Sequence, residues 1–331
     1  MRARRAWQIV AAMLVGASPI LAQTDPCLHR SVAVNVFDNQ NRMIPGLTAG
    51  DFQASFRHQP VKILSVTQSS TARVVIVLDA SGSMRENKSD WEFSVESAKQ
   101  LSNVLPPDVP LGLIVFSTTV EKTISLTNDR QAIVSELDTL RTGRQAILKG
   151  MRKTALWDAM GEALSLFGLR DTGDALYVIS DGMDNVSHVQ TKDLKRDAGI
   201  VRIFALVRDP FPGADSFPGN AELSQLAAES GGSTLIVSNQ RIDERDPLLG
   251  PPQPPPFETV LTGGRISGPK DAQFRRVLSF YRVEVQLPVR VEGTGEWSVK
   301  AVAANGHGLN VAYPRRLTPC EVANPSAKTA R

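Results

Sequence analysis

Apolar and polar positions alternate along the chain with two different periods. Between residues 73 and 238, short runs of β-branched and other apolar residues alternate with segments whose apolar residues recur at helical spacing. The runs predict buried strands, because a strand covered on both faces carries few polar residues. The expected strands are 73–79, 111–117, 175–180, 201–207 and 233–238, and the expected helices are 90–104, 129–141, 154–169 and 189–198. This order predicts an α/β domain, a doubly wound and mostly parallel sheet with helices on both faces.

The two flanks alternate apolar and polar residues one by one, as half-buried strands do. This pattern occurs in SVAVNVF and VKILSVT before the central part, and in FYRVEVQLPV, EWSVKAVAA and GLNVAY after it. We expect these strands to pair in a small antiparallel β module built from both chain ends. A proline-rich stretch, DERDPLLGPPQPPP, predicts an exposed linker, with a docking motif for a proline-reading domain as the alternative. The expected division is 1–22 for a leader, 23–70 for the N-terminal β segment, 71–240 for the α/β domain, 241–270 for the linker, 271–320 for a short helix and the C-terminal β segment, and 321–331 for a tail.

Residues 1–22 have the pattern of a secretory signal peptide. A basic start, MRARRAW, precedes the apolar stretch IVAAMLVGA and a small residue, Ala22, at a plausible cleavage point. An uncleaved N-terminal anchor is the alternative, although the stretch is short for a bilayer span, and the pair Arg4-Arg5 leaves twin-arginine export open. We therefore expect an exported protein that is periplasmic, envelope-associated or secreted, with no membrane span in the mature chain.

Composition and charge exclude several classes of protein. Hydrophobic residues make up 42% and charged residues 21%, which is ordinary for a globular protein and unlike a disordered, collagen-like or coiled-coil chain. The chain has 37 Lys and Arg against 34 Asp and Glu, but three of the arginines lie in the leader, so the rest is balanced. No nucleic-acid partner and no binding to anionic membranes are expected.

The chain contains only two cysteines, Cys27 and Cys320, near the two ends of the mature protein. An oxidising compartment permits a disulfide between them, and two unrelated free thiols are the alternative. With two cysteines and four scattered histidines, a zinc site is not expected.

Oxygen-bearing side chains follow three of the predicted elements. The first buried strand runs into DASGSM, which places Asp79, Ser81 and Ser83 in the turn at its carboxyl end. Thr154 opens the helix of KTALWDA, and Asp181 ends the strand of LYVISDGMDN. Each residue alone could be a helix cap or a turn former. Because all three segments fall at the same edge of the predicted sheet, their oxygens together predict a site for a hard divalent cation.

In this order and spacing, DASGSM, KTALWDA and ISDGMDN resemble the von Willebrand factor type A domain. The resemblance covers about 165 residues and implies a Rossmann-like fold with a metal-ion-dependent adhesion site at Asp79, Ser81, Ser83, Thr154 and Asp181. It also implies Mg²⁺ as the ion, with Mn²⁺ or Ca²⁺ possible, since an oxygen-only site discriminates poorly. The flanks, VNVFDNQNRMIPGLTAGDFQASFRHQPVKI and FYRVEVQLPV, are similar to those of a group of exported bacterial relatives of this domain, described as acidobacterial-type.

One segment departs from the family pattern, because LKGMRKT stands where glycines usually precede the Thr. Its basic residues, Lys149, Arg152 and Lys153, would weaken cation binding but attract an acidic partner, or they simply face solvent. Asp158 lies one turn beyond Thr154 and is expected to accept a hydrogen bond behind the site. Asp184 and Asn185 are expected only to shape their loop.

Two carboxylates and three hydroxyls leave a divalent cation incompletely neutralised, and the resemblance implies that a Glu or Asp of a partner protein completes its coordination. The function expected is therefore adhesion or protein–protein interaction, without catalysis. A structural envelope scaffold with a vestigial site is the first alternative. A metal-dependent hydrolase is the second, although no Glu or His accompanies the site by motif, and neither a Gly-x-Ser-x-Gly nor a phosphate-binding Gly-x-x-x-x-Gly-Lys segment is present.

Overall fold

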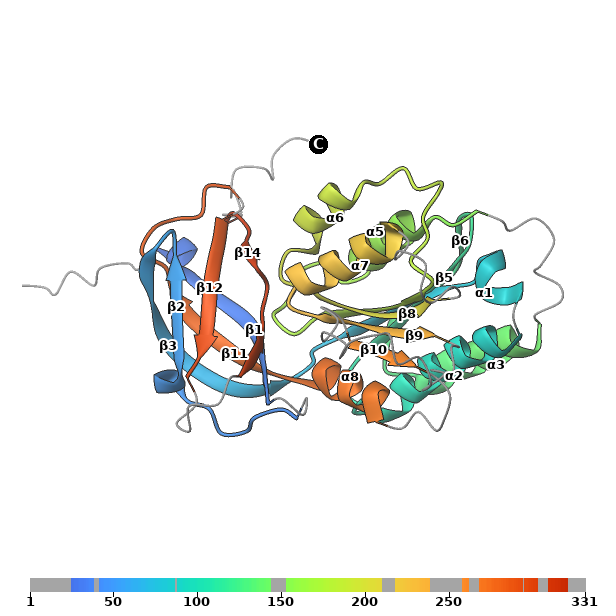
Figure 1. The fold of residues 1–331 in the computed structure, drawn as a ribbon, viewed down its shortest axis with the longest axis horizontal. Coiled ribbons are helices and arrows are strands. Elements are labelled where there is room, and N and C mark those ends of the chain that lie inside the picture. The colour runs from blue at the N-terminus through green and yellow to red at the C-terminus, as the bar shows by residue number, and fades with distance from the viewer. Residues whose placement is uncertain are drawn as a thin grey trace, which may run out of the picture.

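The protein contains two sheets of different kinds, one parallel and covered by helices, the other antiparallel (Figure 1). We call them the α/β unit and the β module. The computed structural model describes residues 25–38, 42–86, 88–143, 153–209, 218–238, 258–261, 268–293, 295–302 and 309–320. The leader 1–22 and the tail 321–331 lie outside these residues.

The α/β unit has seven strands in the order β10-β9-β8-β7-β4-β5-β6, and every neighbouring pair is parallel except β5 and β6. The antiparallel strand lies at one edge of the sheet, and its residues are mostly exposed or half-buried. The predicted doubly wound fold class is thus confirmed. The strands are β4 (Val74–Asp79), β5 (Leu111–Phe116), β6 (Val120–Thr127), β7 (Ala175–Ser180), β8 (Arg202–Asp209), β9 (Ser233–Ser238) and β10 (Glu258–Leu261).

Helices cover both faces of this sheet (Figure 1). Alternate residues of β4 point to opposite faces, so Val74, Ile76 and Leu78 enter one core while Val75 and Val77 enter the other. The first core lies under α2 (Lys88–Val104), α3 (Arg130–Thr142) and α8 (Gly268–Leu278), and the second under α5 (Leu156–Ser165), α6 (Thr191–Ala198) and α7 (Pro218–Glu229). A short helix, α1 (Gly82–Glu86), follows β4 directly. Two buried faces explain why β4, β5 and β7 are apolar almost throughout.

The β module is built from both ends of the chain, as predicted. Its order is β13-β1-β11-β3-β2-β12-β14, with antiparallel neighbours around one apolar core. The N-terminal strands are β1 (His29–Phe37), β2 (Phe52–Phe56) and β3 (Gln59–Ser70), and the C-terminal ones are β11 (Ser279–Gln286), β12 (Gly295–Ala301), β13 (Asn310–Ala312) and β14 (Arg316–Leu317). Two single turns of 3-10 helix, Pro26–Leu28 and Ala49–Asp51, precede β1 and β2.

Several elements differ from the prediction. β10 lies within the stretch expected to be a linker, and α8 begins before residue 271 and packs on the α/β unit through Phe274 and Val277. The α/β unit therefore extends beyond residue 240. The helix α7 was not predicted. Within the described residues, no helix has both the length and the apolar character needed to cross a membrane.

The predicted disulfide between Cys27 and Cys320 is confirmed, with Cα atoms 5.4 Å apart and a sequence separation of 293. It joins the segment before β1 to the segment after β14, so both chain ends are held in the β module.

Arg202, at the start of β8, is fully buried where the two units meet. Its Nη1 donates to the carbonyl of Arg276 at 3.0 Å, and its Nη2 donates to Oγ1 of Thr71 at 2.9 Å and to the carbonyl of Val277 at 3.2 Å. The guanidinium also lies over the ring of Phe280, 4.5 Å from its centroid. Burial lowers the pKa of Arg202 to about 9. Arg202 thus adds a second donor to the carbonyls of Arg276 and Val277, which also accept from Asn35 and Thr71 respectively.

We expect Arg202→Met to lower the free energy of unfolding by about 3 kcal/mol, because it removes several buried hydrogen bonds donated by a charged group. Urea unfolding of the two proteins measures the difference. Arg196→Met is the matched control, since that side chain is 65% exposed and should lose less than about 0.5 kcal/mol. Equal stabilities of the Arg202 variant and the wild type would contradict this role.

Candidate metal centre

Asp79 and Asp181 meet at the carboxyl edge of the sheet because they end or follow neighbouring strands, β4 and β7. Both are buried, at 0% and 2% exposure. Burial, and then the charge of Asp181, raise the pKa of Asp79 to about 7, although Ser180 and Ser81 donate hydrogen bonds that lower it. Burial also raises the pKa of Asp181. The fold therefore places two carboxylates that repel each other in a site with little water to screen them.

The oxygens of Asp79 are held in place by short hydrogen bonds. Oδ1 accepts from the main-chain N–H of Ser81 at 2.8 Å, and Oδ2 accepts from the hydroxyl of Ser180 at 2.6 Å. The hydroxyls of Ser81 and Ser83 lie 3.1 Å apart. The hydroxyl of Ser83 also lowers the pKa of Asp181, so it lies near that carboxylate, and four of the five predicted ligands form one group.

The Asp181 carboxylate is only partly satisfied. Its Oδ1 accepts from the main-chain N–H of Met183 at 3.0 Å, whereas its buried Oδ2 accepts no hydrogen bond within the described part of the chain. A buried carboxylate oxygen without a donor, beside a second carboxylate, suits a cation. The residues thus fit a hard divalent ion, which Asp79, Ser81, Ser83 and Asp181 would hold through oxygen.

Thr154 reaches the same edge through its main chain. Its N–H donates to Oδ1 of Asn185 at 2.9 Å, and its carbonyl accepts from the N–H of Asn185 at 3.0 Å. The Thr154 side chain is buried, at 3% exposure. Asn185, expected only to shape its own loop, therefore also fixes the Thr154 segment against the loop that follows Asp181.

Asp158 contacts that loop rather than Thr154. Its Oδ1 accepts from the main-chain N–H groups of His188 at 2.9 Å and Val189 at 2.8 Å, and its Oδ2 lies 3.1 Å from Nδ1 of His188. Burial alone would raise the pKa of Asp158, but these hydrogen bonds outweigh it and lower the pKa. Asp158 thus joins α5 to the loop after β7, one step away from the candidate ligands. Lys153 is exposed, and Lys149 and Arg152 lie outside the described residues.

A polar chain that the sequence did not reveal connects the first two ligand loops. Arg85 of α1 is fully buried, with Nη2 lying 3.7 Å from Oε2 of Glu121 on β6. Glu121 accepts a hydrogen bond from the hydroxyl of Ser117, and the Ser117 carbonyl accepts from the N–H of Ala155 at 2.8 Å. Burial lowers the pKa of Arg85, whereas the charges of Glu121 and Asp79 raise it. Arg85 therefore offsets part of the negative charge of the site from inside the protein.

The site depends on two carboxylates. Among the described residues, no group of three or more His, Cys, Asp or Glu side chains is placed to hold a metal ion. Ser180 and Glu121 escaped the sequence analysis because Ser and Glu are common in turns and at sheet edges, and Asn185 was assigned only to its own loop. The one available signal was that Ser180 is the only serine in a strand whose other residues are apolar or aromatic.

Residues 74–183, from the start of β4 to just beyond Asp181, match the family model described as von Willebrand factor type A domain. This part of the chain is a von Willebrand factor type A domain. A comparison with curated proteins finds no match. The resemblance of the flanks to exported bacterial relatives remains a prediction.

Several solved structures are similar to the chain at low identity. BatB from Bacteroides thetaiotaomicron, a conserved hypothetical protein, is 21% identical, with 51% of this chain and 91% of that chain covered and a TM-score of 0.40. A von Willebrand factor type A protein from Catenulispora acidiphila is 14% identical, with 89% and 75% covered and a TM-score of 0.42. The manganese-loaded TRAP protein of Plasmodium vivax is 14% identical, with 75% and 95% covered and a TM-score of 0.40. Likeness at this level carries no argument about function.

We expect Asp181→Asn to stabilise the von Willebrand factor A domain in EDTA by about 1–3 kcal/mol, because it removes one of two buried like charges. The amide oxygen can still accept from Met183. The same variant should gain no stability from Mg²⁺, since a charged ligand is lost. Thermal unfolding in EDTA and in Mg²⁺ measures both effects. Asp193→Asn on α6 is the control and should behave as the wild type. If Asp181→Asn is instead less stable than the wild type in EDTA, the hydrogen bonds of the Asp181 carboxylate outweigh its repulsion by Asp79.

Gly182 follows Asp181 with a φ of +77°, and a Cβ atom there would lie 3.1 Å from the Cα of Asn220 on α7 and collide with its side chain. We expect Gly182→Ala to displace the Asp181 loop and lower the apparent affinity for Mg²⁺ at least about tenfold, the equivalent of about 1.4 kcal/mol. Gly46→Ala is the matched control, because its φ is +76° but no atom lies within 4 Å of its Cβ position. Calorimetric titration with Mg²⁺ separates the two: equal affinities would mean that the contact with α7 does not position the ligand loop.

Proposed function

We propose that this protein is an exported, metal-dependent protein-binding module. The observation that carries the proposal is the pair of buried carboxylates, Asp79 and Asp181, with one carboxylate oxygen that accepts no hydrogen bond within the described residues. Such a pair is stable at neutral pH when a cation lies between the charges. Family membership of residues 74–183 supports the same role, because domains of this family are generally interaction modules and not enzymes.

The proposed ligands are Asp79, Ser81, Ser83, Thr154 and Asp181, and Mg²⁺ is the proposed ion. A bound Mg²⁺ would offer a coordination position to a carboxylate of a partner protein. Other residues of the chain orient these ligands. Ser180 and the main chain of Ser81 orient Asp79, while Asn185 holds the Thr154 segment against the Asp181 loop.

The surroundings of the site favour an acidic partner. Ser83 and Lys153 are exposed at this edge, and Met183 is half-buried, so a partner can reach the ligands. Lys153 would attract a negatively charged surface and increase the rate of association. Export is supported by the Cys27–Cys320 disulfide, since such bonds persist in oxidising compartments.

The first test is thermal unfolding of the protein lacking residues 1–22, in Mg²⁺ and in EDTA. At 100 times its dissociation constant, Mg²⁺ should stabilise the wild type by about 2.7 kcal/mol and leave Asp79→Ala unchanged. Asp193→Ala, which replaces a half-buried acid on α6 away from the candidate ligands, should respond as the wild type. Identical melting curves of the wild type in both conditions would refute the metal site and favour a structural scaffold.

The second test concerns the partner. Capture of an envelope protein by the immobilised wild type should require Mg²⁺, fail with Asp79→Ala, and disappear when the carboxylates of the extract are first converted to amides. Capture that survives amidation would exclude completion by a carboxylate. Turnover of ester or phosphoester substrates by the wild type, lost in Asp79→Ala, would instead indicate a hydrolase.

A further inference from the structure

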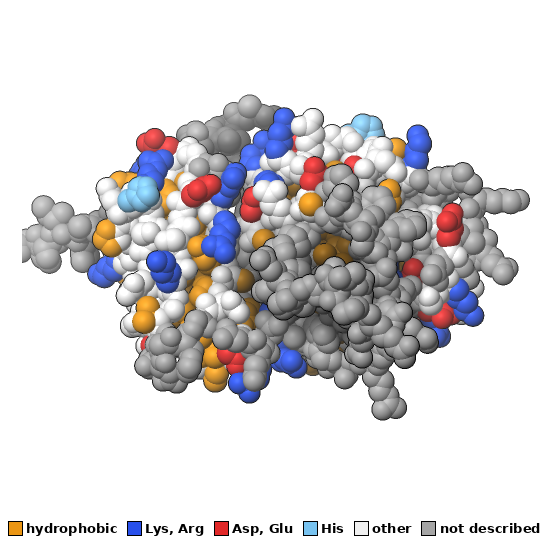
Figure 2. Space-filling model, in the orientation of Figure 1, with side chains coloured by type: hydrophobic (Ala, Val, Ile, Leu, Met, Phe, Trp, Pro, Cys, Tyr) orange, Lys and Arg blue, Asp and Glu red, His pale blue; other side chains and the backbone are white. Residues whose placement is uncertain are grey.

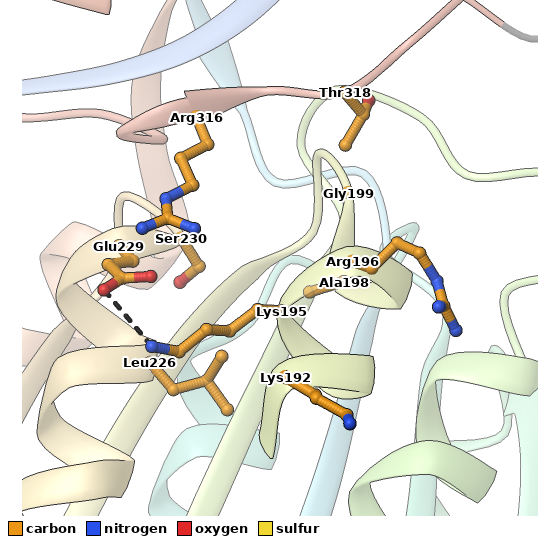
Figure 3. Close-up of a pocket in the computed structure, with 10 residues that line it drawn as sticks. All are labelled: Lys192, Lys195, Arg196, Ala198, Gly199, Leu226, Glu229, Ser230, Arg316 and Thr318. Atoms are coloured by element: carbon orange, nitrogen blue, oxygen red, sulfur yellow. Dashed lines mark hydrogen bonds and ion pairs between the residues drawn. The ribbon is translucent and has the colours of Figure 1, made fainter. Parts of the chain in front are cut away.

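A basic pocket lies where the α/β unit meets the β module, on a different part of the molecule from the candidate ligands; we call it the seam pocket. In Figure 2, Lys and Arg side chains gather along this boundary, with acidic side chains among them. The seam pocket has a volume of about 160 Å³ and opens between α6, α7 and β14 (Figure 3). Its charged lining residues are Lys192, Lys195 and Arg196 of α6, Glu229 of α7 and Arg316 of β14. Four cations thus surround one carboxylate.

The single carboxylate is engaged through one of its two oxygens, while its buried Oε2 accepts no hydrogen bond within the described residues. Oε1 of Glu229 lies 3.3 Å from Nζ of Lys195 and accepts from Nε2 of Gln225 at 2.7 Å. The ammonium of Lys195 is therefore neutralised inside the pocket, as the dashed line in Figure 3 shows. Arg196 turns away from the other cations in Figure 3 and pairs with Asp193 and Asp197 of its own helix.

Two cations remain with little counter-charge. Lys192 forms no ion pair within the part of the chain that the structure describes. Arg316 approaches only Glu296, at 3.9 Å, and the Glu296 side chain is 84% exposed, so water screens that pair. Lys192 comes from α6 and Arg316 from β14, so the two cations belong to different units. The Lys192 ammonium points away from Arg316 in Figure 3, so a ligand contacts both when the exposed Lys192 side chain turns into the pocket.

A neighbouring hollow adds a third cation. This second cavity, of about 20 Å³, shares Gly199, Arg316 and Thr318 with the seam pocket and is also lined by Arg30. The buried Nη2 of Arg30 donates to no acceptor within the described residues, and burial lowers the pKa of Arg30. A buried guanidinium nitrogen without an acceptor, next to a pocket with excess positive charge, indicates that an anionic group is missing.

We propose that the seam pocket binds a small anion that carries a phosphate or carboxylate group, held between Lys192 and Arg316. The guanidinium of Arg316 can contact two oxygens of such a group, and Lys192 supplies a point charge. Leu226 and Ala198 form an apolar wall that accommodates a short hydrocarbon part. Because the walls come from both units, the bound anion also fastens β14 to α6. This proposal does not depend on the metal site.

The test is thermal unfolding of the protein lacking residues 1–22 in inorganic phosphate, in citrate and in chloride at equal ionic strength. We expect phosphate or citrate to raise the melting temperature by about 2–5 °C with a saturable, one-site dependence. The double variant Lys192→Gln/Arg316→Gln should lose this rise. The matched control is Lys88→Gln/Arg42→Gln, which also removes one lysine and one arginine charge. Both side chains are 70% exposed and lie outside the pocket, so this variant should keep the rise in melting temperature.

Three outcomes would overturn the proposal. A rise that persists in the pocket variant, or that disappears in both variants, would mean a general salt effect or an adventitious ion only. The absence of any rise with both anions would mean that the pocket holds no free small anion. Co-sedimentation with phosphatidylglycerol vesicles, without a response to phosphate or citrate, would identify a membrane surface in place of a soluble ligand. Chemical-shift changes at Gly199 and Thr318 upon addition of phosphate would support the proposal by locating the bound group.

Discussion

Asp79 and Asp181 end or follow neighbouring strands of the central sheet, so the register of β4 and β7 forces both carboxylates to one buried edge. Their repulsion is a cost that the fold does not remove, since burial limits screening by water. The local structure instead holds the charges in place, with Ser180 on one carboxylate and Met183 on the other. The remaining oxygen of Asp181 accepts no hydrogen bond within the described residues, and the proposed metal-dependent function depends on that oxygen.

The β module constrains the α/β unit through a small number of buried contacts. Arg202 links β8 to main-chain carbonyls of α8 and to Thr71 near the end of β3. The Cys27–Cys320 disulfide closes the module around both chain ends. Since unfolding the module would leave Arg202 exposed and its acceptors unpaired, the two units are expected to lose structure together. The seam pocket lies in the same boundary, where a ligand can act on both.

Elements with a strong local pattern were predicted well. The apolar runs 175–180 and 233–238 coincide with β7 and β9, because strands buried on both faces admit almost no polar residues. The hairpin between β2 and β3 was missed because its turn uses Arg57 and His58 with positive φ, and neither residue signals such a turn. β10 was missed because it follows a proline-rich stretch, and its pairing with β9 is a non-local contact.

The amino-acid sequence by itself determined the order of strands and helices, the joining of the two chain ends in one module, and the oxygen-bearing residues at the sheet edge. These features follow from periodicity and from motifs a few residues long. The tertiary structure alone decided that Asn185 holds the Thr154 segment, that Asn220 packs on Gly182, and that Lys192 and Arg316 line the same pocket from opposite units. The physical reason is that each of these contacts joins residues far apart in the chain. Their partners depend on how the sheets and helices pack, and no local pattern encodes that packing.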